Sequence, residues 1–183
     1  MAILRVLGIA GSLRQGSYNR RLLEAATEVL ADADWTIARL RGIPPYDADV
    51  EARGNPPAVV QLKDQIEAAD ALVIATPEYN HSIPGVLKNA IDWASRPTNG
   101  SPLVGKPVVL LGASPGRGGA RRALEHLRQV LESTSAIPAE QQLSVGGVRD
   151  RLEDGSLDAA LHDELRRVLG QLQRTEAMAT TTE

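Results

Sequence analysis

The sequence predicts a three-layer α/β sandwich, in which helices cover both faces of a five-stranded parallel sheet. Short apolar runs alternate along the chain with segments whose apolar residues recur at helical spacing. The strongest run, Ala71–Ala75, is apolar at every position, as in a strand that is buried on both faces. Strands that alternate with helices pair in parallel through right-handed crossovers, so the helices divide between the two faces of one sheet.

The expected strands follow from the apolar runs. Four of them are Ile3–Ala10, Thr36–Leu40, Ala71–Ala75 and Pro107–Gly112, and a fifth lies within Ala136–Val145. We expect the order 2-1-3-4-5 across the sheet, as in flavodoxin-like folds. A chain of 183 residues without a linker, repeat or low-complexity segment is typical of one domain. We place this domain at residues 1–174 and expect residues 175–183 to form a disordered tail.

Helices are predicted between these strands. Helical spacing runs over residues 19–30, 59–69, 84–94, 120–131 and 157–172. Pro57 suits the first turn of the second helix, and Ser156 is the expected N-cap of the last one. The segment from Pro44 to Pro57 is expected to be a loop.

Composition excludes several classes of function. A formal net charge of −3 and 3% aromatic residues provide no basic or stacking surface for nucleic acid. The absence of cysteine excludes thiolate metal sites and a cysteine nucleophile. The histidines, at positions 81, 126 and 162, are far apart in the sequence and are expected to be surface or packing residues rather than ligands. No run approaches the roughly 18 apolar residues of a membrane span, and the N-terminus carries no targeting signal. We therefore expect no nucleic-acid, metal or membrane partner, and a cytoplasmic location.

Three polar loops follow predicted strands. They lie within Gly8–Arg20 after the first strand, at Thr76–His81 after the third, and at Ala113–Gly119 after the fourth. In the expected order these strands are neighbours, so their loops lie side by side beyond the carboxyl ends of the strands. Ligands bind there in open α/β sheets.

The first loop has the features of a phosphate site. Glycines, hydroxyls and a cation connect a buried strand to a helix N-terminus, where free N–H groups and the positive end of the helix dipole converge. The glycines fall at Gly8, Gly11 and Gly16, which is not the G-x-G-x-x-G spacing of dinucleotide sites. The gap from Gly11 to Gly16 matches a nucleotide P-loop, but Ser17 stands where that loop requires lysine. A terminal phosphate monoester is the anion that remains.

Four side chains are candidate ligands of this phosphate, namely Ser12, Arg14, Ser17 and Asn19. Arg14 offers charge-assisted hydrogen bonds, and the hydroxyls and backbone amides complete a cup around the anion. The alternative interpretation is a capped turn, in which Ser17 or Asn19 is the helix N-cap and Arg14 lies in solvent.

The other two loops suit the polar edge of a planar heterocycle. Thr76–Ser82 places a rigid Pro77, Tyr79 and several polar groups at a strand end. The alternative is a turn in which Tyr79 packs on the core. The glycines of Ala113–Gly119 let backbone N–H groups approach a ligand, although a single glycine-rich loop does not specify which ligand.

Together, these segments resemble the NADPH-dependent FMN reductase family, which includes bacterial quinone and chromate reductases. The first loop, GSLRQGSYNR, is similar to the family's phosphate loop. PEYNHSIPGVLKNAIDWASRP, over Pro77–Pro97, matches its central motif, and GASPGRGGARRALEHLRQVL, over Gly112–Leu131, resembles its third segment. The segment Pro45–Asp49 is also typical of the family, and the resemblance covers about residues 1–150. One departure is Leu124-Glu125, where relatives often carry Gln-Tyr; it puts any oligomer contact of that helix in doubt.

The resemblance implies a flavodoxin-like fold with bound FMN, NADPH or NADH as electron donor, and a homodimer or tetramer. Residues of the first loop would bind the FMN phosphate, Pro77–Asn80 would lie along the isoalloxazine, and the loop after the fourth strand would face its pyrimidine side. The implied cofactor-binding residues are Gly11, Ser12, Arg14, Ser17, Tyr18, Asn19, Pro77, Glu78, Tyr79, Asn80, Ser114 and Gly116. No catalytic acid or base and no metal ligand is expected.

The implied activity is an NAD(P)H oxidoreductase reaction, in which the flavin does the chemistry and the protein positions it. We hypothesise a ping-pong cycle: NAD(P)H binds and leaves before a quinone, a flavin, chromate or an azo compound takes its place. Backbone N–H groups of Ser114–Gly116 would stabilise negative charge on the flavin. Glu78 is expected to brace a loop or lie in solvent, and Arg117 is a candidate contact for the extra phosphate of NADPH.

Two alternatives stay open at this point. One is a flavodoxin-type electron carrier, which has the same cofactor but no NAD(P)H activity. Such carriers are usually strongly acidic, so a net charge of −3 favours the enzyme. The other alternative is a flavin-free binding module.

Overall fold

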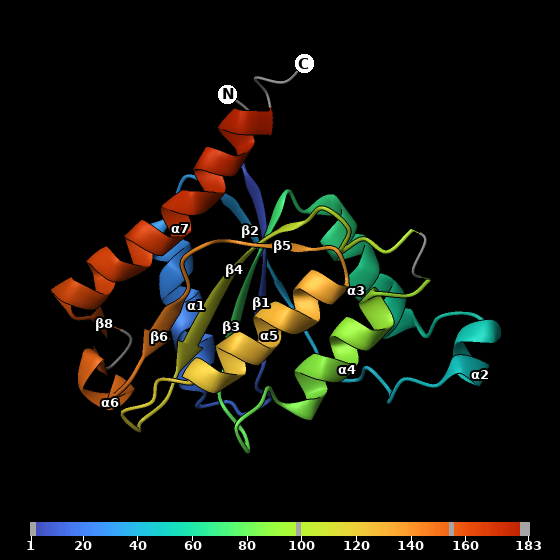
Figure 1. Cartoon of the computed structure of the whole chain (residues 1–183), viewed down its shortest axis with the longest axis horizontal. Helices are drawn as coiled ribbons and strands as arrows, with labels where there is room; N and C mark the ends of the chain where they lie inside the picture. The colour runs from blue at the N-terminus through green and yellow to red at the C-terminus, as the bar shows by residue number, and fades with distance from the viewer. Residues whose placement is uncertain (1–2, 98–99, 154–155, 180–183) are drawn as a thin grey trace.

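Helices lie on both faces of a central sheet in the computed structural model, which describes residues 3–97, 100–153 and 156–179 (Figure 1). In chain order the elements are β1 (Arg5–Ala10), α1 (Tyr18–Val29), β2 (Asp34–Ala38), α2 (Ala48–Ala52), α3 (Pro57–Ala68), β3 (Ala71–Thr76), α4 (Gly85–Ala94), β4 (Pro107–Ala113), α5 (Arg121–Ser133), β5 (Ile137–Pro138), β6 (Leu143–Val145), α6 (Val148–Arg151), β7 (Leu152–Glu153), β8 (Ser156–Leu157) and α7 (Ala159–Ala179). The predicted three-layer α/β class is confirmed.

The main sheet has the predicted order β2-β1-β3-β4-β5, and its strands pair in parallel. β3 is buried at every position, because β1 and β4 flank it and helices cover both of its faces. The ends of the strands are in register. Ala10 of β1 lies opposite Ala75, and Thr76 lies opposite Gly112 of β4. This register brings the loops after β1, β3 and β4 to one edge of the sheet.

The fifth strand, expected somewhere within Ala136–Val145, is divided into β5 and β6. β5 and β6 both pair in parallel with β4. Pro138 lies opposite Val108 and Leu143 opposite Leu111, so this edge advances five residues while β4 advances three. The extra residues form a bulge. The Gln171 side chain of α7 hydrogen-bonds both backbone groups of Gln141 in this bulge, at 2.9 and 3.0 Å. A side chain therefore replaces the missing strand partner.

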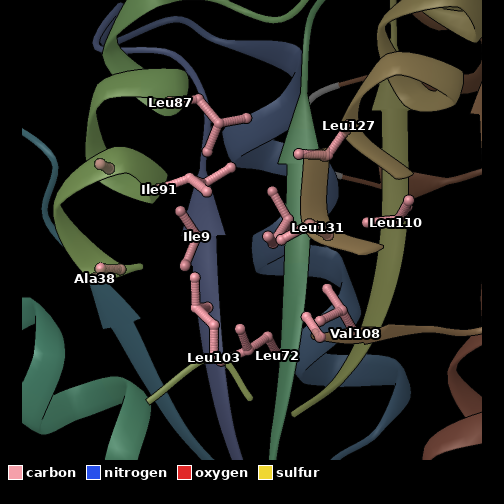
Figure 2. Close-up of a cluster of buried hydrophobic side chains, with 14 of the residues drawn as sticks. Ile9, Ala38, Leu72, Leu87, Ile91, Leu103, Val108, Leu110, Leu127 and Leu131 are labelled. Atoms are coloured by element: carbon pink, nitrogen blue, oxygen red, sulfur yellow. The ribbon is translucent and has the colours of Figure 1, made fainter. Parts of the chain in front are cut away.

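The helices divide between the two faces as predicted. α1 and α7 cover one face, and α3, α4 and α5 cover the other (Figure 1). On the second face, side chains of α4 and α5 pack over those of β1, β3 and β4; they include Ile9, Leu72, Leu87, Ile91, Leu110, Leu127 and Leu131 (Figure 2). Burying a side chain of this size contributes about 1.5–3 kcal/mol. This packing fixes the two helices and, with them, the loops that lead into them.

The segment between Pro44 and Pro57 is not entirely a loop, because it contains the short helix α2. Asp47 caps this helix, and its carboxylate accepts a hydrogen bond from the N–H of Asp49 at 2.8 Å. No side chain of α2 is buried. Apolar spacing therefore could not reveal it, since that signal comes only from helices that pack on a core.

The N-cap predicted for the last helix is wrong. Ser156 lies in the short strand β8, and α7 begins at Ala159. Asp158 takes the capping position, where its carboxylate accepts a hydrogen bond from the N–H of Leu161 at 2.6 Å. α7 continues through Ala179, so residues 175–179 are helical. Residues 180–183 lie outside the described residues, and the extent of the domain and its tail stays a prediction.

Candidate functional site

The three polar loops meet at one end of the sheet, at the lower side of Figure 1. Gly11, at the start of the first loop, donates its N–H to the carbonyl of Ala75 at 2.8 Å. A Cβ atom at Gly11 would lie 2.9 Å from the Thr76 hydroxyl and 3.0 Å from a Leu87 methyl. Glycine suits this position because the side chains of Thr76 and Leu87 leave little room for a Cβ.

Ser17 is the N-cap of α1, and it is 3% exposed. Its hydroxyl accepts a hydrogen bond from the N–H of Arg20 at 3.4 Å. Its own N–H donates to the Arg14 carbonyl at 3.2 Å, and the Arg14 N–H donates to the Ser12 hydroxyl at 3.3 Å. The capped-turn interpretation is therefore correct for Ser17. The first turn of α1 also directs the N-terminal end of the helix toward this loop.

The same loop offers an anion-binding cup. In the part of the chain that the structure describes, the N–H groups of Leu13, Gln15 and Gly16 meet no protein acceptor. The Arg14 guanidinium lies 5.8 Å from the centre of the Tyr18 ring and forms no ion pair with a described acid. A phosphate monoester binds well to such a combination of free N–H groups, a helix N-terminus and an unpaired cation. The loop therefore suits the FMN phosphate.

Asn19 connects the first and third loops. It is 2% exposed, its amide donates to the Ala113 carbonyl at 2.9 Å, and its amide oxygen accepts from the Ala113 N–H at 2.8 Å. Both ends of the amide are thus bound to the last residue of β4. Its assignment as a phosphate ligand stays a prediction, whereas the structure gives it a different role: it holds α1 against the end of β4.

The second loop is a tight turn that projects Tyr79. Tyr79 and Ser82 exchange two backbone hydrogen bonds, of 2.9 and 3.0 Å. Asn80 and His81 between them have φ angles of 51° and 65°, as in a type I′ turn. Asn and His are among the residues that adopt this conformation most readily. Tyr79 is 51% exposed, so the alternative in which Tyr79 packs on the core is wrong.

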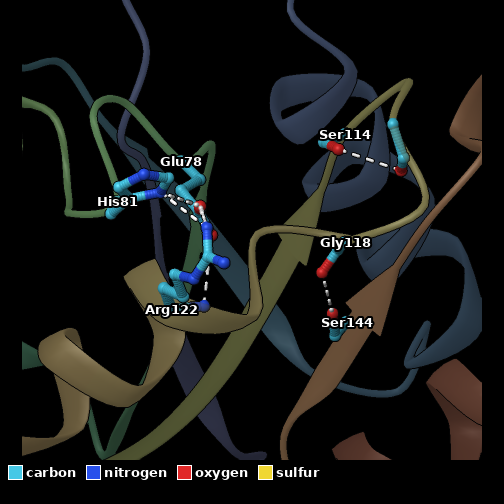
Figure 3. Close-up of polar contacts among 7 residues, drawn as sticks. Glu78, His81, Ser114, Gly118, Arg122 and Ser144 are labelled. Atoms are coloured by element: carbon cyan, nitrogen blue, oxygen red, sulfur yellow. Dashed lines mark hydrogen bonds and ion pairs between the residues drawn. The ribbon is translucent and has the colours of Figure 1, made fainter.

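Glu78 braces the second loop against α5, in agreement with one of the two expectations for this residue (Figure 3). Its carboxylate accepts a hydrogen bond from the N–H of Arg122 at 3.1 Å. α5 has no cap from its own N-cap residue, Ala120, so Glu78 supplies the acceptor from another segment. Burial alone would raise the pKa of Glu78, but hydrogen bonds from His81 and from the first turn of α5 hold that pKa below its usual range. The carboxylate therefore stays ionised.

The third loop rests on a segment that sequence reasoning did not select, namely residues 144–148. The Ser114 N–H donates to the Val145 carbonyl at 3.0 Å, and the Ser144 hydroxyl donates to the Gly119 carbonyl at 2.8 Å. The expectation that the Ser114 N–H stabilises negative charge on the flavin is therefore wrong, because the pairing of β4 with the next segment uses this N–H. A Cβ atom at Gly146 would lie 2.5 Å from the carbonyl oxygen of Arg117. Figure 3 shows two further contacts of this loop: the Ser114 hydroxyl donates to the Gly116 carbonyl at 3.1 Å, and the Ser144 hydroxyl donates to the Gly118 carbonyl at 3.4 Å. The glycine pair Gly146-Gly147, which follows the predicted fifth strand, is the feature of the sequence that could have indicated this segment.

A protein-family model described as NADPH-dependent FMN reductase matches residues 4–150. The match spans most of the chain and contains all three loops. The chain belongs to the NADPH-dependent FMN reductase family. Its predicted resemblance is thus confirmed, and so are its oxidoreductase class and the family's cofactors, FMN and NAD(P)H.

The names of related proteins agree with membership of this FMN reductase family. An NAD(P)H-dependent FMN reductase of Pseudomonas aeruginosa is 56% identical over 129 residues, covering 70% of this chain and 69% of that protein. A quinone reductase of Escherichia coli is 44% identical over 149 residues, covering 79% of this chain and 78% of the relative. FerB, a flavoenzyme NAD(P)H:(acceptor) oxidoreductase from Paracoccus denitrificans, superposes with a TM-score of 0.85 at 30% identity, covering 94% and 98% of the two chains.

The described residues contain neither a membrane-spanning helix nor a cluster of metal ligands. None of the helices within them is long and apolar enough to cross a membrane. Among the same residues, no group of three or more His, Cys, Asp or Glu side chains could hold a metal ion.

Proposed function

We propose that this protein binds FMN at the meeting point of the three loops and passes electrons from NAD(P)H to small oxidants, quinones first among them. The observation that carries the proposal is the anion cup of the first loop, which lies at the same sheet edge as the loops after β3 and β4. FMN, when bound, supplies the hydride chemistry, and the protein supplies binding and orientation.

Each loop has a distinct part in this proposal. Arg14 and the N–H groups of the first loop would bind the phosphate. Pro77–Asn80 would lie along the isoalloxazine, in a turn that Glu78 fixes to α5. Ser114 and Gly116 would face the pyrimidine side, and residues 144–148 hold their loop in place. No side chain is required as a catalytic acid or base.

The order of binding is a separate part of the proposal. We infer a ping-pong cycle, in which the nucleotide leaves before the oxidant binds, because one open face would serve both. The name of the Escherichia coli relative supports a quinone as acceptor. Chromate and azo compounds stay predictions, and a panel of acceptors would rank them. Parallel lines in double-reciprocal plots would support the ping-pong order, whereas intersecting lines would contradict it.

Arg14→Ala tests the flavin site. We expect FMN affinity to fall by about 1.5–3 kcal/mol, the scale of a charge-assisted hydrogen bond. Riboflavin, which lacks the phosphate, should bind the variant and the wild type equally. Arg20→Ala is the matched control, since the Arg20 guanidinium pairs with Glu24 at 3.0 Å on the same helix. Unchanged FMN affinity in Arg14→Ala would place the phosphate elsewhere.

Two further measurements separate the alternatives. Purified protein that neither carries nor takes up FMN would support a flavin-free module. Full FMN occupancy without NADPH oxidation in the presence of a quinone would support an electron carrier. A homodimer or tetramer and a cytoplasmic location also stay predictions, which light scattering and cell fractionation would test.

A further inference from the structure

The carbonyl groups of the third loop are held from one side. The carbonyl of Gly116 accepts a hydrogen bond from the N–H of Gly147 at 3.1 Å. The carbonyl of Ser114 accepts one from the N–H of Val148, also at 3.1 Å. In a trans peptide the C=O and the N–H point in opposite directions, so the N–H of Arg117 points away from these partners. Among the described residues that N–H meets no acceptor, so it is a donor left for a ligand.

The donors that hold this loop belong to the start of α6. Gly147 is the N-cap of α6, and Val148 is its first residue. A helix of four residues is not stable by itself, because its few hydrogen bonds do not offset the cost of ordering the backbone. Of the four described residues of α6, only Val148 is buried. The position of α6, and of the loop that it holds, therefore depends on contacts from elsewhere in the fold.

Arg151, the last residue of α6, makes such contacts with the start of α7, which lies next to α6 in Figure 1. Its guanidinium donates to both carboxylate oxygens of Asp158, at 2.9 and 3.3 Å. It also donates to both carboxylate oxygens of Glu164, at 3.4 and 3.3 Å. The Arg151 carbonyl accepts a hydrogen bond from the Asp158 N–H at 3.0 Å. The planar guanidinium suits this arrangement, because its donors form a rigid fork.

α7 is a firm support for Arg151 because it packs on the sheet. Leu161, Leu165, Val168 and Leu169 of α7 are each at most 1% exposed and belong to the core on that face. The side chain of Arg151 is 25% exposed, so solvent screens its two ion pairs only in part. A continuous series of contacts therefore leads from the sheet through α7, Arg151 and α6 to the third loop.

We propose that Arg151 is a positioning residue for the flavin, which acts through α6 on the third loop. This inference rests on the proposed function, in which that loop faces the pyrimidine side of FMN. Within the described residues, the guanidinium of Arg151 binds Asp158 and Glu164 and not the first loop, so it affects the flavin ring rather than the phosphate. The family match ends at residue 150, so this chain takes the support of the loop from residues beyond the match.

Flavin binding is the first part of the test. The dissociation constants of FMN and riboflavin are measured for the flavin-free full chain by flavin fluorescence. In Arg151→Gln both flavins should bind about two- to tenfold more weakly, the effect of about one net hydrogen bond, because both present the same ring to the third loop. Arg167→Gln is the matched control, since Arg167 is exposed on α7 and pairs with no acid among the described residues. This control should bind both flavins as the wild type does.

The midpoint potential of the FMN-loaded chain is the second part, because it separates positioning from the charge of the side chain itself. Reduction places negative charge on the flavin, so displacement of the N–H donors of the third loop lowers the potential. Arg151→Gln removes a positive charge and Glu164→Ala removes a negative one, so a direct effect of charge would shift the two potentials in opposite directions. Loss of positioning lowers both. We expect both potentials to fall, while Arg167→Gln keeps the wild-type value.

Unchanged or opposite shifts of the two potentials would overturn the inference while the wild type still binds FMN and oxidises NADPH. Wild-type affinities in Arg151→Gln, or a loss confined to FMN, would overturn it too. A wild-type protein that binds neither flavin would overturn the proposed function, and the inference with it.

Circular dichroism verifies that the variants are folded. If Arg151→Gln does not fold, Glu164→Ala, which keeps the pair between Arg151 and Asp158, takes its place in both measurements. Weaker binding of both flavins and a lower potential in Glu164→Ala would then support the inference. Wild-type affinities or a raised potential would overturn it.

Discussion

Replacing Asn19 with alanine removes the side chain that ties the first loop to the end of β4. In the wild type, two hydrogen bonds of 2.9 and 2.8 Å join its amide to Ala113, and Asn19 is 2% exposed. In the variant, the N–H and carbonyl of Ala113 lose these partners in a buried place. Each orphaned group costs about 1–3 kcal/mol, while the better helix propensity of alanine returns about 0.5 kcal/mol. We expect the free energy of unfolding to fall by about 1.5–5.5 kcal/mol.

Urea denaturation of the flavin-free protein, followed by circular dichroism, measures this change. The midpoint should fall while the slope stays constant, since the exposed surface of the unfolded chain does not change. Arg20→Ala, on the same helix, breaks only an exposed ion pair with Glu24 and should shift stability by about 0.5 kcal/mol or less. A loss in Asn19→Ala no larger than in this control would refute the role of Asn19 as a tie.

Flavin binding then separates the tie from a direct phosphate contact. If Asn19 holds two loops together, its loss weakens FMN and riboflavin alike, because both ligands need the loops in place. If Asn19 binds the phosphate itself, only FMN loses affinity. An effect confined to FMN would restore the ligand role that the family resemblance implies and would contradict the positioning role.

Further predictions concern the support of the third loop and the start of α7. Gly146→Ala should displace the third loop and weaken FMN binding, because its Cβ would lie 2.5 Å from the Arg117 carbonyl oxygen; Gly118→Ala, with no atom near its Cβ, is the control, and equal flavin affinities would contradict this. Hydrogen bonds from Arg151 and from the first turn of α7 hold the pKa of Asp158 below its usual range. The stabilisation is therefore complete above the unfolded-state pKa of about 4 and is lost as pH falls through the folded-state pKa. Asp158→Asn, which keeps a capping side chain, should lower stability at neutral pH by about 0.5–1 kcal/mol, and denaturation at several pH values should show this difference narrowing in acid; a constant difference would refute it.

Local patterns were enough to predict the strands and helices, and with the strand order of flavodoxin-like folds they predicted that the three polar loops meet at one edge of the sheet. The run Ala71–Ala75 is apolar at every position, and β3 is buried at every position for that reason. Ser17 was a predicted capping candidate, and it caps α1. Such signals succeed because they depend on residues close together in the sequence. α2 escaped the same reasoning, since none of its side chains is buried.

Short-range features predicted the α/β class and the three polar loops, because strand burial, helical spacing and turn residues each depend on neighbouring positions. The strand order was expected from flavodoxin-like folds. The roles of individual side chains emerge only when the chain is folded. Asn19 binds Ala113 and Glu78 caps α5, each across a long stretch of sequence. His81 meets Arg122 for the same reason. Which distant backbone or charge a polar side chain reaches depends on how strands and helices pack, and no local pattern records that.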